Sequence, residues 1–209
     1  MNEQFNINKY VVVENAITKE VAQFISQYFL LKRKCVEVMK HEKVISPYVD
    51  YLGTWDDSQA PNTYSHYADF AMETLLLGLK NLMEDVTGLP LYENYSYARI
   101  YKYGDQLLRH LDRFSCEIST TLNLGGDPWP IYLDPTGGKN NQGIEVNLKP
   151  GDMLVYRGSE LEHWRYPFSG TSCVQVFLHY NNKNTEGAEQ NKYDRRPFVG
   201  LPGCFKINK

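Results

Sequence analysis

The first third of the chain contains two stretches in which apolar residues recur with helical spacing. A β-branched run over residues 9–13 predicts a short strand ahead of the first helix. Thr18 is the expected N-cap of that helix, and the basic cluster over residues 32–34 is expected at its end, where cations complement the helix dipole. The spacing predicts one buried apolar face, formed by Val21, Phe24, Ile25, Tyr28 and Phe29. The second helix is expected from about Tyr67 to Val86.

Residues 42–66, between these helices, combine Pro, Gly, Asp and Asn with scattered aromatics and follow no period. We expect a long irregular region that contributes to the rim of a site. His66 is interpreted as a surface histidine. His41 and His179 are interpreted as ordinary histidines, with lining of a cavity by His179 as the less favoured alternative.

The periodicity changes to that of strands at Tyr95. In YSYARIYKYG the odd positions share one strand face, which places Arg99 among Tyr95, Tyr97, Tyr101 and Tyr103. Such a face is either a solvated stripe or the lining of a polar cavity that binds an anion. Short strands then alternate with turns, among them a turn region over 135–143 and a tight turn over 149–152. This pattern predicts a mainly β sandwich or barrel with supporting α-helices on one sheet.

Composition is that of a globular domain. With 209 residues, 42% of them hydrophobic, one domain over 1–209 is expected, with helical support to about residue 92, a β core over about 93–180 and an extension over 181–209 that packs back on it. The net charge of −3 gives no reason to expect nucleic acid, and no stretch is long and apolar enough for a membrane span.

The beginning of the chain and its cysteines bear on location. The N-terminus lacks an apolar signal core, and the 4 cysteines show no CxxC pairing. We therefore expect a cytoplasmic protein with reduced cysteines and no structural zinc. The oligomeric state stays open.

Three residues indicate a metal. His110 and Asp112 lie two positions apart, so on an extended strand their side chains share a face. His163 completes a set of two imidazoles and one carboxylate if the fold brings it alongside. This set is typical of non-haem Fe(II) oxygenases, because it leaves open positions on the ion. A His-x-Asp pair alone is weak evidence, since such pairs also occur on surfaces.

The longer segments around these residues strengthen the interpretation. YKYGDQLLRHLD places Tyr101 and Gly104 ahead of His110, and KPGDMLVYRGSELEHWRYPFSG places a Pro-Gly-Asp turn ahead of His163. Both resemble motifs of the prolyl-4-hydroxylase-like Fe(II)/2-oxoglutarate dioxygenases, and the resemblance covers roughly residues 9–180. It implies a double-stranded β-helix, the jelly-roll fold related to the cupins. It also implies that His110, Asp112 and His163 bind Fe(II), with 2-oxoglutarate and O2 as co-substrates.

The resemblance extends to the co-substrate pocket. It implies that Tyr101 donates a hydrogen bond to the distal carboxylate of 2-oxoglutarate and that Thr120 lines the same pocket. The family also carries a Lys or Arg after the distal histidine to pair with this carboxylate, but residues 171–173 of this chain read Thr-Ser-Cys. A buried carboxylate without a cationic partner is unfavourable, so another cation is needed.

Two arginines are candidates for that cation. Arg165 lies two residues past His163 and shares its strand face, and it is narrowly favoured over Arg99, which shares a face with Tyr101. Gln175 is expected to add a neutral contact. Tyr97 and Trp129 are expected in the substrate pocket, Trp129 by stacking.

Three classes of function are compatible with the sequence. The favoured one is an Fe(II)/2-oxoglutarate-dependent hydroxylase acting on an unactivated C–H bond of a peptidyl-prolyl, amino-acid or small-molecule substrate. Asp112 supports hydroxylation, because the related halogenases carry a small residue there. The alternatives are a cupin-like metalloenzyme that does not use 2-oxoglutarate and a non-catalytic jelly-roll binding module.

Overall fold

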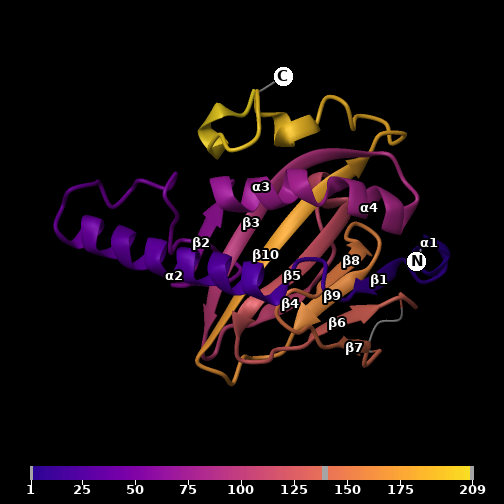
Figure 1. The fold of residues 1–209 in the computed structure, drawn as a ribbon, viewed down its shortest axis with the longest axis horizontal. Helices are drawn as coiled ribbons and strands as arrows, with labels where there is room; N and C mark the ends of the chain where they lie inside the picture. Colours follow the sequence, from indigo (N-terminus) through magenta and orange to yellow (C-terminus); the bar gives the residue numbers. More distant parts are fainter. Residues whose placement is uncertain (1, 138–140, 208–209) are drawn as a thin grey trace.

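Two antiparallel β-sheets face each other in the computed structural model, which describes residues 2–137 and 141–207 (Figure 1). The middle of the predicted turn region 135–143 lies outside the described residues. The six-stranded sheet has the order β1 (Tyr10–Val13), β8 (Met153–Arg157), β5 (Ile118–Gly126), β10 (Ser172–Asn182), β3 (Leu91–Lys102), β2 (Tyr64–Tyr67). The four-stranded sheet has the order β4 (Leu107–His110), β9 (Glu162–Arg165), β6 (Ile131–Asp134), β7 (Ile144–Val146). The predicted mainly β jelly-roll fold is confirmed.

Helices cover the outer face of the larger sheet (Figure 1). They are α1 (Asn2–Asn8), α2 (Lys19–His41), α3 (Phe70–Gly78) and α4 (Lys80–Thr87), and three short 3-10 helices follow: η1 (Phe114–Cys116), η2 (Lys192–Arg195) and η3 (Gly203–Phe205). Helix α2 packs on β5, and α3 packs on β3 and β10. Strands β1 and β2 come from the part of the chain predicted as helical support, so that part also completes the sheet at both edges.

Alternation along β3 separates the core from the site. Ala98 and Ile100 belong to the apolar core beneath the helices. Tyr95, Tyr97 and Arg99 point to the other face and line a cavity between the sheets. The predicted shared face of the odd positions is therefore present, except that β3 ends at Lys102 and leaves Tyr103 exposed.

The first helix differs from its prediction in register and length. Thr18 caps it as expected, with its side chain accepting from the backbone N–H of Val21. The buried residues of α2 are Ala22, Ile25, Ser26, Phe29 and Val36, whereas Val21 and Phe24 are exposed. The helix continues to His41, so the basic cluster lies inside it and not at its end. Lys32 turns inward and forms an ion pair with buried Asp69.

The second predicted helix is broken. Tyr67 belongs to β2, Asp69 caps α3, and Leu79 separates α3 from α4 after Gly78, a residue that weakens a helix. His66 is buried, and its Nδ1 lies 3.1 Å from Asp69 Oδ2, so its interpretation as a surface histidine is wrong. The prediction failed because the residues around His66 are polar and follow no period, as surface segments commonly do.

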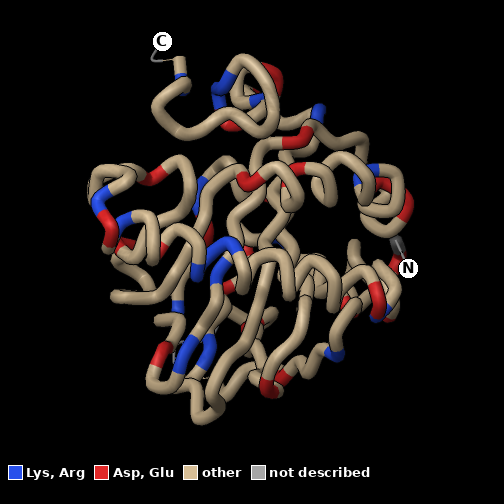
Figure 2. Tube along the Cα trace, turned by 60° about the vertical axis from the view of Figure 1, so that its left-hand side comes forward, with Lys and Arg blue, Asp and Glu red and all other residues tan. Residues whose placement is uncertain are grey.

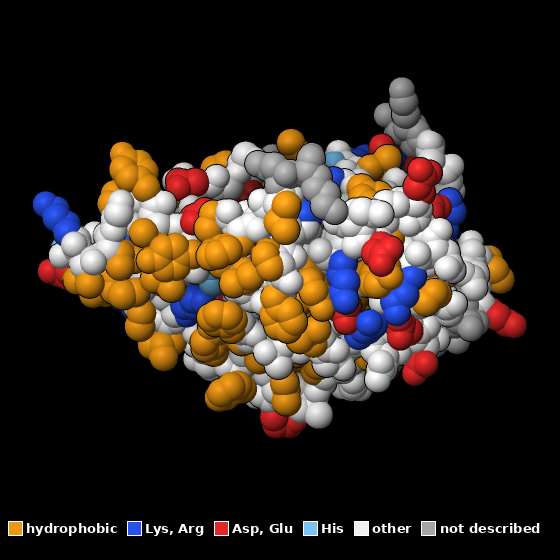
Figure 3. Space-filling model, turned by 90° about the horizontal axis from the view of Figure 1, so that it is seen from above, with side chains coloured by type: hydrophobic (Ala, Val, Ile, Leu, Met, Phe, Trp, Pro, Cys, Tyr) orange, Lys and Arg blue, Asp and Glu red, His pale blue; other side chains and the backbone are white. Residues whose placement is uncertain are grey.

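The segment after β10 returns over the helical side of the domain, above α3 in Figure 1. Buried Arg196 anchors it through an ion pair of 3.1 Å with Glu73 of α3. Figure 2 shows Lys and Arg interspersed with Asp and Glu along the trace. Seen from above, hydrophobic side chains gather over part of this face (Figure 3), and the segment contributes exposed Phe198 and Phe205. Among the described residues, no helix combines the length and apolar character that crossing a bilayer requires.

Candidate metal centre

Strand pairing brings the two histidines together. His110 ends β4, His163 lies in β9, and the register places them directly opposite each other, with ring centroids 4.3 Å apart. Asp112 follows β4, and its backbone N–H donates to Gly158 O at 2.9 Å. The Nε2 atoms of His110 and His163 each lie 3.6 Å from Asp112 Oδ1. The three predicted ligands therefore meet at one point.

The other ring nitrogens set the orientation of both imidazoles. Nδ1 of His110 lies 2.7 Å from Leu108 O, and Nδ1 of His163 lies 3.0 Å from Leu161 O. A carbonyl only accepts, so we assign the proton of each neutral ring to Nδ1. Both Nε2 lone pairs then face the shared point, which is the arrangement of metal-binding histidines.

Electrostatics keep the carboxylate ionised. Burial raises the pKa of Asp112, but the interactions that its carboxylate would make with His110 and His163 in their protonated forms outweigh burial and lower the pKa to about 2. Ser119 Oγ donates to Asp112 Oδ2 at 2.8 Å, so Oδ1 stays directed at the histidines. Burial lowers the pKa of His163 and favours the neutral imidazole. At His110 burial also lowers the pKa, but the interaction with Asp112 outweighs it and raises the pKa, so a bound cation would displace a proton from this ring. An ionised carboxylate and neutral imidazoles are what a divalent cation requires.

Gly158 makes room for this arrangement, which the sequence alone did not indicate. A Cβ added to it would collide with Asp112 Oδ2 and lie 2.8 Å from Ser119 Oγ and 2.5 Å from Cys116 O. Only a residue without a side chain fits between these groups. The glycine at the end of the VYRG stretch was the available signal.

A cavity of about 380 Å³ opens above the three residues. Its wall includes Asp57 and Gln59, so the irregular region 42–66 does contribute to the rim, and His179 lines the cavity as in the less favoured alternative. Arg99 is buried there and already paired, with its Nη2 2.6 Å from Asp57 Oδ2 and its Nη1 donating to Tyr101 Oη at 3.0 Å.

Arg165 is buried in a different environment. One guanidinium nitrogen donates to Trp129 O, and another lies 3.4 Å from Thr121 Oγ1. Its Nε has no hydrogen-bond partner, and no carboxylate of the described residues pairs with it. Burial lowers its pKa. An interior guanidinium without an anion is unfavourable, which indicates a site for an anionic ligand.

The structure places the other residues predicted for the co-substrate pocket in different surroundings. Thr120 lies on the core face of β5, where its Oγ1 accepts from Leu178 N at 3.1 Å, and Thr121 is the threonine beside Arg165. One position of strand alternation accounts for the difference. Thr121 Oγ1 donates to Gln175 Oε1 at 3.2 Å, so Gln175 does lie near Arg165.

The aromatic residues predicted for the site also differ in where they lie. Tyr101 is buried with its ring 4.8 Å from that of Trp129. Trp129 packs against Tyr101 and Phe168 and does not line the cavity. Tyr97 does line it. Tyr156 was not predicted, yet its ring lies edge-on to His163 at 4.8 Å and lines the cavity. Alternation along β8 was the signal for it.

Asp112, Cys116 and His179 form a second cluster of potential ligand atoms. Burial raises the pKa of the Cys116 thiol to about 12, and Tyr95 Oη lies 3.0 Å from its sulfur. His179 Nδ1 is occupied by Ser119 Oγ at 3.0 Å. A protonated thiol is a poor ligand, so His110, Asp112 and His163 are the better metal site.

Comparisons place this fold among known structures. No family model matches the chain, and no curated protein matches its sequence. A prolyl-4-hydroxylase from Pseudomonas putida is 14% identical over 87% of this chain and 97% of that chain, with a TM-score of 0.61. The non-haem α-ketoglutarate-dependent epimerase SnoN of nogalamycin biosynthesis is 13% identical over 100% of this chain and 91% of that chain, with a TM-score of 0.64. HygX from Streptomyces hygroscopicus, solved with nickel and 2-oxoglutarate, is 14% identical over 88% of each chain, with a TM-score of 0.60. The chain therefore shares the double-stranded β-helix fold of these 2-oxoglutarate-dependent enzymes.

Proposed function

We propose that the protein is an Fe(II)- and 2-oxoglutarate-dependent oxygenase. The observation that carries the proposal is the convergence of His110 Nε2, His163 Nε2 and Asp112 Oδ1 at the floor of the cavity. Two imidazoles and one carboxylate on one side of an ion leave its other positions open to the cavity. Fe(II) at this point would supply the activation of O2, which no side chain of the protein performs.

Arg165 supports 2-oxoglutarate as the co-substrate. Its unpaired guanidinium lies near Tyr101, Tyr156 and Thr121, and these groups would hold the distal carboxylate by charge and hydrogen bonding. Arg99 is the weaker candidate, because Asp57 already compensates its charge. We assign Arg99 and Tyr97 to the prime substrate. The same orphaned guanidinium argues against a cupin-like metalloenzyme without 2-oxoglutarate.

Hydroxylation of an unactivated C–H bond is the proposed reaction, on a small-molecule or peptide substrate. Asp112 at the halogenase-determining position favours it over halogenation. The epimerase SnoN has the same fold, and this shows that the fold does not fix the reaction. The residues of this chain contribute placement of the substrate beside the metal and exclusion of water from it.

The test is anaerobic titration of the purified protein with Fe(II) and 2-oxoglutarate. We expect a weak visible charge-transfer band that disappears in His110→Ala, Asp112→Ala and His163→Ala, all three of which retain the wild-type circular dichroism spectrum. Iron binding without the band would favour the metalloenzyme that does not use 2-oxoglutarate. Absence of iron binding would favour the non-catalytic binding module. Succinate release across peptide, amino-acid and small-molecule panels would then define the substrate.

A further inference from the structure

A second depression adjoins the cavity above the metal centre. It has a volume of about 320 Å³ and is lined by Arg113, Ser115, Gln190, Asn191 and Arg195, together with Phe114 and Gly187. Arg113 lines both spaces, and its guanidinium lies 4.9 Å from the ring centre of Tyr95, which belongs to the cavity wall. Arg113, the residue after the proposed iron ligand Asp112, is therefore part of the wall of both spaces.

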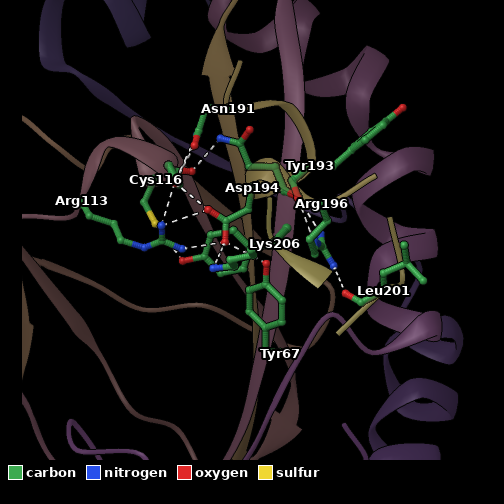
Figure 4. Close-up of polar contacts among 12 residues, drawn as sticks. Tyr67, Arg113, Cys116, Asn191, Tyr193, Asp194, Arg196, Leu201 and Lys206 are labelled. Carbon is green, nitrogen blue, oxygen red and sulfur yellow. Dashed lines mark hydrogen bonds and ion pairs between the residues drawn. The ribbon is translucent and has the colours of Figure 1, made fainter. Parts of the chain in front are cut away.

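Asp194 forms an ion pair with this arginine (Figure 4). Arg113 Nη1 and Nη2 each donate to the Asp194 carboxylate at 3.0 Å, and Nη1 also donates to Ser115 Oγ at 2.7 Å. Tyr67 Oη, Lys206 Nζ and Ser115 Oγ also contact the carboxylate of Asp194, which is fully buried. Asp194 fixes the position of Arg113 but compensates only part of its charge, because Lys206 binds the same carboxylate, and the Arg113 side chain is half-exposed.

Backbone strain places the second arginine. Tyr193, Asp194 and Arg195 have φ values of 56°, 55° and 62°, a left-handed run that residues with a side chain rarely adopt. The contacts of Asp194 over-determine the conformation of this run, and strain held in this way is typical of ligand sites. Its consequence here is that Arg195 lines the depression.

Charge around the depression is positive. The Asp194 carboxylate is shared by two cations, Arg113 and Lys206. Arg195 is exposed and forms no ion pair with the described residues, and the described lining contains no Asp or Glu. The amide of Gln190 also lines the depression, whereas the Ser115 hydroxyl already donates to Asp194 Oδ1 at 2.8 Å. Two guanidinium groups and an amide suit a carboxylate or phosphate group.

We propose that this depression is an anion subsite that holds an acidic group of the prime substrate while its reacting carbon lies at the metal. The substrate class is thus a compound that carries a carboxylate or a phosphate. That the bound anion belongs to a substrate rests on the proposed function, whereas the binding of an anion in this depression does not.

The experiment uses metal-free, isotope-labelled full-length protein at low ionic strength, titrated with inorganic phosphate and, separately, with acetate. Wild type should show amide shifts confined to residues 113–115 and 187–195. Arg195→Gln should weaken binding about fivefold, the effect of losing one exposed charge-assisted contact. Arg195→Lys should retain most of it. Lys192→Gln, with the same charge change outside the depression, should match wild type.

Shifts scattered over the surface, or equal affinity in Arg195→Gln and wild type, would overturn the subsite. Phosphate should bind more tightly than acetate on charge alone, so binding of phosphate without detectable binding of acetate identifies a phosphorylated substrate, and binding of both shows that the subsite also accepts a carboxylic acid. The charge-transfer band of wild type with Fe(II) and 2-oxoglutarate is recorded separately. If only that band is missing, the oxygenase proposal fails and the anion site stands.

Discussion

Arg99 and Arg165 show how the pairing of a single residue separates two roles. Both are buried arginines of the β core. Arg99 lies against Asp57 and donates to Tyr101, so its charge is compensated within the protein. Arg165 has only neutral acceptors and one unsatisfied Nε. Substitution of an arginine without an anionic partner and substitution of one that already has such a partner should therefore affect ligand affinity and stability in opposite ways.

Replacing Arg165 by Met should therefore weaken the binding of 2-oxoglutarate without lowering the stability of the free protein. Leaving the distal carboxylate buried and unpaired corresponds to about 3–5 kcal/mol, a loss of a few hundredfold or more in affinity. Removing an uncompensated interior cation should leave the free energy of unfolding equal or higher. The measurements are 2-oxoglutarate dissociation constants with Mn(II) in place of iron, and urea unfolding of the free protein.

Arg99→Met is the matched control. It strands the Asp57 carboxylate, so it should lower the free energy of unfolding by about 3–5 kcal/mol while changing 2-oxoglutarate affinity much less. If the two variants exchange these patterns, Arg99 holds the co-substrate. If neither variant weakens 2-oxoglutarate tenfold, a neutral pocket around Tyr101 and Gln175 is the remaining explanation.

Sequence reasoning reached the three ligand residues because their spacing and flanking turns are local features. It predicted Thr120 in the co-substrate pocket, whereas Thr121 is the threonine beside Arg165. The side of the sheet on which a strand residue lies depends on register, which local sequence does not fix. Register along β5 is set by pairing with β8 and β10, and one of these pairings contains an irregularity. Tyr156 was missed for the same reason, since its position beside His163 depends on how the two sheets face each other.

At the level of elements, the turn after β8 decides whether the ligands converge. The backbone carbonyl of Gly158 accepts a hydrogen bond from the N–H of Asp112 at 2.9 Å. The N–H of Gly158 donates to Glu117 O at 3.0 Å. This glycine thereby ties the segment that carries Asp112 to the end of β8. Its missing side chain leaves the space that the Asp112 carboxylate and the Ser119 hydroxyl occupy.

Gly158→Ala should consequently damage the metal site more than the fold. The added methyl displaces Asp112 from the histidines, and losses of about 10–100-fold in metal affinity are typical when groups that orient a ligand are disturbed. The measurement is Mn(II) affinity, with the unfolding transition followed alongside.

Gly78→Ala serves as the control, because a Cβ there meets nothing within 4 Å and the residue lies in a helix. It should leave metal affinity unchanged and raise stability by about 0.5–1 kcal/mol. Wild-type metal affinity in Gly158→Ala would show that Asp112 does not depend on this close approach.

Across the whole molecule, helices were predicted where local signals were strong and misjudged where tertiary partners decide. The Thr18 cap is encoded locally, but the buried face of α2 follows from packing on β5, and Lys32 points inward because Asp69 lies there. The segment 183–207 has no periodicity of its own. Its path depends on distant partners such as Glu73 and Arg113, which a reading of adjacent residues does not supply.

The ion pairs of this segment make stability depend on acid. Burial raises the pKa of Asp194, but Arg113 and Lys206 outweigh it and hold the pKa well below the ordinary value of 3.8. The unfolded chain binds a proton at higher pH than the folded one, so this contribution is complete above the unfolded pKa and is lost as pH falls through the lowered one. Asp194→Asn should be less stable at neutral pH, and its loss of stability between neutral pH and about pH 3 should be smaller than that of wild type by roughly 1 kcal/mol.

Urea unfolding at several pH values measures this difference, with exposed Asp50→Asn as the control that keeps the wild-type acid dependence. Parallel acid profiles for Asp194→Asn and wild type would mean that the carboxylate titrates normally in the folded protein.

Arg196 joins the C-terminal segment to the helical layer. Its Nη2 lies 3.1 Å from Glu73 Oε2 and donates to Asn94 O at 2.9 Å, and the same Glu73 oxygen accepts from Gly200 N at 2.8 Å. Arg196→Met leaves the buried Glu73 charge without its cation, which should lower the free energy of unfolding by about 3–5 kcal/mol.

Glu73→Gln in the same chain should recover part of this loss. A neutral amide still accepts from Ser96 N, whose bond to Glu73 Oε1 is 2.6 Å long, and it removes the stranded charge. The double-mutant cycle, measured by urea unfolding, should therefore give a coupling of about 1–3 kcal/mol. Additive effects would mean that the two side chains act independently, and the segment would then be held by its backbone contacts and not by the ion pair.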